Sequence, residues 1–115
     1  MTRRQIPFSF ILLFALVLFF VSGQHHTAEA RNVYVGTYSD DGSDAYLLTE
    51  TVNIYNYHPL EFTCTVYATG DHLRYHFFRR NGESYYRNSE GYEGYTFGGQ
   101  SPVAANIYRF VVNYY

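Results

Sequence analysis

The chain has 115 residues, a formal net charge of −2 at pH 7 and one cysteine, and aromatic residues make up 21% of it. One cysteine excludes an intramolecular disulfide, on which small exported domains usually depend. The mild acidity argues against nucleic-acid binding, which needs a basic surface. We therefore expect stability to come from aromatic side chains, which include 14 tyrosines and no tryptophan.

The first 30 residues have the pattern of a secretory signal peptide. Two arginines at positions 3 and 4 precede an apolar run from Phe8 to Val21, and Ala28-Glu29-Ala30 fits a signal-peptidase site. The run is shorter than the ~20 residues that a membrane-spanning helix needs. We predict export, with cleavage after Gly23 or Ala30, to a secreted or periplasmic location without a stable membrane span. A retained N-terminal membrane anchor is the alternative.

Residues 31–115 are expected to form a single small α+β domain with a four- or five-stranded, mainly antiparallel sheet. Their six arginines, nine carboxylates and lack of lysine give a formal charge of −3. In the segment 60–68, alternate residues are apolar, which predicts a strand with one buried face that includes Cys64. Further strands are expected at 33–38, 46–55, 73–80 and 83–88, and 90–99 is expected to be an irregular loop or to contain a short strand around 95–97.

Two turns and a helix complete the predicted domain. The acidic segment 40–44 is expected to be a solvated hairpin turn, since its spacing does not match a calcium-binding loop. Asn81-Gly82 predicts a two-residue hairpin turn, because both residues adopt positive φ readily. Ser101 suits a helix N-cap and Pro102 the first helical position. The helix is expected to pack on the sheet through residues at helical spacing, which are Val103, Ile107, Phe110, Val111 and Tyr114.

Four short stretches carry a resemblance to a group of proteins. They are Val33-Tyr34-Val35-Gly36-Thr37-Tyr38, Tyr46-Leu47-Leu48-Thr49-Glu50-Thr51, Asn88-Ser89-Glu90-Gly91-Tyr92 and Ser101-Pro102-Val103-Ala104. With them, residues 31–115 resemble small exported bacterial proteins with no assigned function. The resemblance implies a bacterial envelope or extracellular location, and it carries no catalytic residue or ligand to transfer.

The sequence contains no recognisable catalytic motif. Strand alternation places Cys64 on the core face, away from the histidines that a nucleophilic thiol would need. Glu50 is a charged residue that we expect on an apolar face with Leu48, Val52 and Ile54. A β-bulge or an edge position would let it reach water, an ion pair with Arg79 would neutralise it, and a raised pKa would suit it to general acid catalysis. No metal or other cofactor is indicated.

The predicted hairpin gathers cationic and aromatic side chains on its outward face. The turn places Arg80 opposite Glu83, Phe78 opposite Tyr85, Phe77 opposite Tyr86 and His76 opposite Arg87. The candidate ligand-binding residues are therefore Arg74, His76, Phe78, Arg80, Tyr85 and Arg87. A solvated sheet face whose rings only support strand pairing is the alternative.

We expect a non-enzymatic exported binding module for an unknown envelope or extracellular ligand, such as a glycan or an anionic envelope polymer. One alternative is a small secreted hydrolase that uses Glu50. Another is an inhibitor of a foreign hydrolase that presents residues 92–97.

Overall fold

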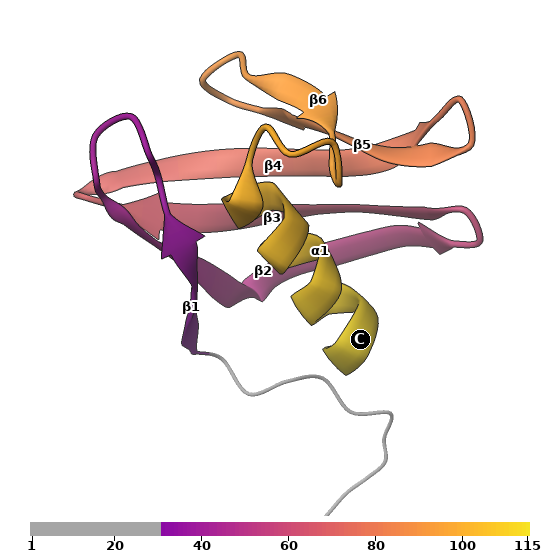
Figure 1. Ribbon diagram of the computed structural model, residues 1–115. Coiled ribbons are helices and arrows are strands. Elements are labelled where there is room, and N and C mark those ends of the chain that lie inside the picture. The colour runs from indigo at the N-terminus through magenta and orange to yellow at the C-terminus, as the bar shows by residue number, and fades with distance from the viewer. Residues whose placement is uncertain (1–30) are drawn as a thin grey trace, which may run out of the picture.

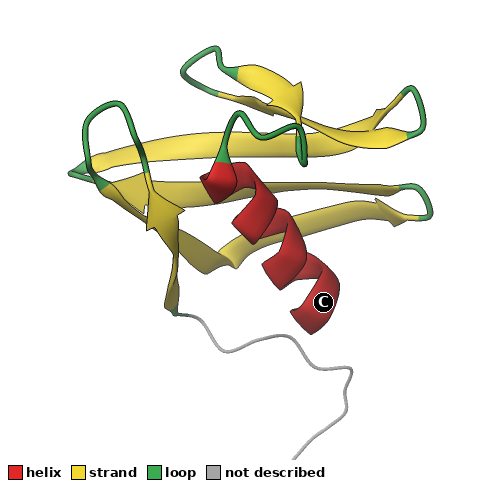
Figure 2. Ribbon diagram, viewed as in Figure 1, coloured by secondary structure: helices red, strands yellow, loops and turns green. Residues whose placement is uncertain are grey.

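Six strands follow one another across an antiparallel sheet in chain order, and one helix lies on a single face of it (Figures 1 and 2). The computed structural model describes residues 31–115, and the predicted signal peptide lies outside this part of the chain. The sheet curves round the helix as a half-barrel. The elements are β1 (Asn32–Thr37), β2 (Asp44–Tyr57), β3 (Leu60–Ala68), β4 (Asp71–Arg80), β5 (Glu83–Asn88), β6 (Glu93–Tyr95) and α1 (Pro102–Tyr114).

The antiparallel sheet with a C-terminal helix is as predicted, but the sheet has six strands rather than four or five. The additional strand is β6, which pairs Tyr95 with Tyr85 and Gly94 with Tyr86. Glycines and a turn around Gly91 surround this short segment, so its local composition is that of a loop. Pairing with β5 nevertheless makes it a strand, which begins two residues earlier than the short strand considered from the sequence.

The core lies between the concave face of the sheet and α1. The predicted alternation of β3 is confirmed, because Phe62, Cys64 and Val66 are at most 1% exposed. Phe62 stacks on Phe77 of β4 with 4.6 Å between ring centroids. Cys64 is a free thiol in this core, and burial raises its pKa above the ordinary value of a thiol.

Helix α1 begins as predicted, and most of the predicted contacts are confirmed. Ser101 Oγ accepts a hydrogen bond from the Ala104 amide at 3.1 Å. Val103, Ile107 and Val111 are buried and Phe110 is partly buried against the core. Tyr114 is exposed instead, and the partly buried tyrosines of this region are Tyr108 and Tyr115. Within residues 31–115, no helix is both long and apolar enough to cross a membrane.

The predicted faces of β2 are wrong, because a bulge in the strand changes which side chains point toward the core. The register with β3 shifts between Leu48 and Asn53. Leu47 and Thr49 are buried before the shift, whereas Val52 and Ile54 pack on the core after it. Leu48 therefore lies on the opposite face from these two residues, contrary to the prediction. Glu50 is exposed at the bulge, which agrees with the expectation that a bulge lets it reach water.

The hairpin between β4 and β5 has the predicted turn and register. Asn81 and Gly82 have φ values of 53° and 79°. Arg80 pairs with Glu83, Phe78 with Tyr85, Phe77 with Tyr86 and His76 with Arg87. The register follows from a two-residue connection that leaves no freedom for a slip.

Replacing Gly82 tests the turn. A Cβ atom there would meet no other atom within 4 Å, so a substitution acts through the positive φ alone. We expect Gly82→Val to lower the free energy of unfolding by ~1–2 kcal/mol, and Gly82→Asn to lower it less, because asparagine tolerates this conformation. Urea unfolding of both variants measures the difference. A valine variant as stable as the parent would contradict the turn.

Candidate functional site

The outer face of the sheet, which is the face opposite α1, carries the predicted ligand-binding residues. Alternation along β4 and β5 puts their core-facing residues toward α1, with Tyr75, Phe77 and Tyr86 buried there. The residues between these positions point outward. Within residues 31–115, no helix covers this outer face (Figure 1).

Four of the predicted residues form two cation–ring pairs on the outer face. The Arg80 guanidinium lies 4.6 Å from the centroid of the Tyr85 ring, and the Arg87 guanidinium lies 5.4 Å from that of Phe78. The two rings are themselves in contact, with 5.6 Å between centroids. We call these four residues the cation–ring cluster. Their cross-strand contacts follow directly from the hairpin register.

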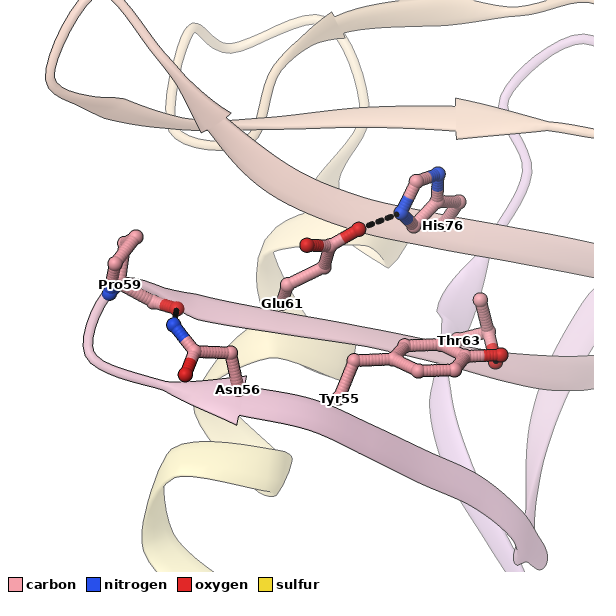
Figure 3. Close-up of polar contacts among 6 residues, drawn as sticks. All are labelled: Tyr55, Asn56, Pro59, Glu61, Thr63 and His76. Atoms are coloured by element: carbon pink, nitrogen blue, oxygen red, sulfur yellow. Dashed lines mark hydrogen bonds and ion pairs between the residues drawn. The ribbon is translucent and has the colours of Figure 1, made fainter.

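Carboxylates orient two of the predicted ligand-binding side chains, Arg87 and His76. Arg87 Nε donates a hydrogen bond to Glu93 Oε1 at 2.7 Å, from the neighbouring strand β6. His76 Nε2 lies 2.8 Å from Glu61 Oε2, and Figure 3 shows these side chains pointing toward one another from β4 and β3. The His76 ring also lies 4.9 Å from that of Phe78. The structure thus brings His76 against the cation–ring cluster.

Arg74 lies outside the cation–ring cluster, and Tyr85 is the buried member of that cluster. Arg74 is exposed on β4 and takes part in no ion pair within the described residues. Tyr85 is 8% exposed, because Arg80 covers its face and Tyr95 meets it edge-on at 5.0 Å. Tyr85 therefore supports the exposed groups around it, whereas the arginines present polar edges to solvent.

A second set of aromatic side chains lies on the outer face and was not predicted from the sequence. The ring centroids of Tyr34 in β1 and Tyr46 in β2 are 5.8 Å apart, and those of Tyr67 in β3 and His72 in β4 are 5.3 Å apart. Tyr46 and Tyr67 are register partners, so the four residues form one row across four strands. The outward parity of each was readable, but their alignment depends on strand registers that the sequence does not give.

An acidic pocket of about 460 Å³ lies on the α1 side and was also missed. Its lining includes four carboxylates, from Asp40, Asp41, Asp71 and Glu90. The 40–44 segment is the predicted turn between β1 and β2, where Asp41 accepts hydrogen bonds from Ser43 that lower the pKa of Asp41. Such a lining can hold a polar or cationic molecule, but these carboxylates come from three separate segments of the chain, so no spacing motif could have found the set.

Two tyrosine hydroxyls form a hydrogen bond in the wall of this pocket. Tyr38 Oη and Tyr75 Oη are 2.7 Å apart. Burial raises the pKa of both phenols, and the hydrogen bond between them raises the pKa of Tyr38 further. Both hydroxyls therefore stay protonated at neutral pH.

The residues weighed for catalysis are not brought together. Glu50 lines neither this pocket nor the apolar pocket described below, and it forms no ion pair with Arg79 within the described residues. The ion pair expected as one outcome for Glu50 is therefore wrong. Cys64 is buried on the core face, as alternation predicted, while His76 points outward. In residues 31–115, no group of three or more potential ligands is placed to hold a metal ion.

Comparison of the chain with models of protein families, with curated proteins and with solved structures finds no match in any of the three.

Alkaline unfolding tests the tyrosine pair. The unfolded phenols titrate at their ordinary pKa of 10.0, whereas the folded ones keep their protons to higher pH. Their contribution to stability is therefore complete below pH 10 and is lost as the pH rises above it. For buried Tyr75 the loss approaches ~1.4 kcal/mol per pH unit.

The measurement is the urea midpoint as a function of pH. We expect the double variant Tyr38→Phe/Tyr75→Phe to lose less stability above pH 10 than the parent protein. Tyr92→Phe, at an exposed position of the same pocket, is the matched control and should follow the parent. Identical slopes for the double variant and the parent would refute the assignment.

Proposed function

We propose that the protein is an exported binding module whose outer sheet face binds an acidic glycan. The observation that supports this best is the cation–ring cluster, in which two arginines lie over two rings in mutual contact. Export rests on the N-terminal pattern of the sequence, which lies outside the described residues.

The cluster suits an acidic sugar because its arginines are held in place before a ligand arrives. Arg87 is held by the Phe78 ring and by Glu93, which occupies only Nε and leaves the terminal guanidinium nitrogens to other acceptors. A guanidinium fork matches a carboxylate group in geometry. Side chains that are already ordered lose less entropy on binding, so they bind more tightly.

The aromatic side chains supply the second element of glycan recognition. Tyr34 and Tyr55 are 56% and 58% exposed, and Tyr67 is 38% exposed on the same face. Figure 3 shows the Tyr55 side chain extending along β2 toward Thr63 of β3, whose hydroxyl lies 3.5 Å from Tyr55 Oη. Tyrosine offers rigid contact area with a polar tip, which suits a surface of mixed polarity such as a sugar ring.

The distribution of charge favours an acidic ligand over a neutral one. Residues 31–115 are net acidic, yet three of their six arginines, which are Arg74, Arg80 and Arg87, lie on the outer face of one hairpin. Glu93 neutralises part of this charge through its ion pair with Arg87. Arg74 and Arg80 have no carboxylate partner within the described residues, so they remain available to an anion.

A titration with polygalacturonate, a polymer of sugar carboxylates, tests the proposal. We expect binding at about 0.05 M salt that weakens at about 0.5 M, because salt screens exposed charges. The double variant Arg74→Ala/Arg87→Ala should bind at least about tenfold more weakly, a loss of ~1.4 kcal/mol. Its melting temperature should barely change, because exposed arginines add little stability.

Arg109→Ala is the matched control. The Arg109 guanidinium also lies over a ring, 5.2 Å from the centroid of Phe97, but it belongs to α1 on the other side of the sheet. It should bind as the parent does. No binding at low salt, or equal losses in the Arg109 variant and the double variant, would favour a solvated sheet face. If neutral dextran bound as tightly as polygalacturonate, the charge of the ligand would not contribute to recognition.

A further inference from the structure

A second pocket, of about 550 Å³, lies between the β2–β3 hairpin and the C-terminal half of α1, on the opposite side of the sheet from the proposed glycan surface. Its volume falls within the ~300–1,000 Å³ of small-molecule sites. One wall comes from the hairpin, with Ile54 and Leu60, and the facing wall comes from Val111 and Val112 of α1. The lining is thus mainly aliphatic and aromatic.

Aromatic ring contacts connect this pocket to the core. Tyr108 of α1 lines the pocket. The centroid of its ring lies 6.2 Å from that of Phe62 and 6.1 Å from that of Phe77. Both phenylalanines are fully buried in the core. The ring of Tyr108 therefore joins the apolar interior to the open pocket, and an apolar ligand there would extend an existing core.

Arg79 adds a solvent-exposed cation to this lining. It follows Leu73, Tyr75 and Phe77 in the alternation along β4, so it lies on the α1 side of that strand. Arg79 lines the pocket together with His58, and no Asp or Glu side chain is found among the described residues of the lining. Nor does Arg79 take part in an ion pair anywhere within residues 31–115.

We propose that this pocket, which we call the Arg79 pocket, binds a medium-chain fatty acid. The Arg79 guanidinium would hold the carboxylate as a bidentate pair. The acyl chain would lie between Ile54 and Leu60 on one side and Val111 and Val112 on the other. A ligand with one anionic end and one apolar chain satisfies both chemical features of the lining, whereas a sugar would leave the aliphatic walls exposed.

Calorimetry with decanoate below its critical micelle concentration tests the proposal. The protein is used in the form that its host produces. We expect Arg79→Gln to weaken decanoate binding at least tenfold and to leave decanol binding unchanged, because decanol has the chain without the charge. Val112→Glu should weaken decanoate binding as well, since it adds a carboxylate at an exposed position of the wall.

Arg80→Gln is the matched control, because Arg80 is adjacent in sequence but points to the outer face. It should bind decanoate as the parent does, and polygalacturonate binding should be unaffected in Arg79→Gln. No decanoate binding, or equal losses in the Arg79 and Arg80 variants, would overturn the proposal. A dimer that Val112→Glu dissociates would also overturn it, because a second copy would then fill the pocket.

Discussion

Helix α1 lies so close to β1 that a Cβ atom on Gly36 would come within 3.2 Å of Val103 Cγ2. Asn106 Nδ2 donates to the Val35 carbonyl, and Tyr115 Oη donates to the Thr49 carbonyl, so polar contacts tie both the middle and the end of the helix region to the sheet. The rest of the described structure depends on this docking. It buries one face of the sheet and, since no second helix occurs within residues 31–115, it leaves the other face open.

The docking also separates the charges of a weakly acidic chain. Four carboxylates line the pocket at the turns near the start of α1, whereas Arg79 stands alone in the apolar pocket near its end. Three further arginines point outward from the β4–β5 hairpin. The fold therefore presents an acidic region, an apolar pocket with one cation and a cationic aromatic face. Net charge alone describes none of them, because it averages surfaces that face different directions.

Local chemistry explains which features could be predicted from the sequence. Asn81-Gly82 specifies both the turn and the pairing of Phe78 with Tyr85, so the cation–ring cluster was predictable by residue. The faces of β2 were not, because the charge of Glu50 indicated a bulge only as one of several outcomes, and the bulge changes the side-chain parity of the strand. Both pockets join residues far apart in the chain, as with Arg79 and Val112, and depend on where α1 crosses the sheet.

We propose that the open face of the sheet is the binding surface. An NMR titration of the protein with polygalacturonate tests it most directly, because it maps the contact residue by residue. The account predicts that resonances of outward residues on β3 to β5 shift, those of Arg74, Phe78 and Arg87 foremost, while those of buried Ile107 and Val111 stay unchanged. Shifts confined to the residues of the two pockets, or no shifts at saturating polymer, would contradict it.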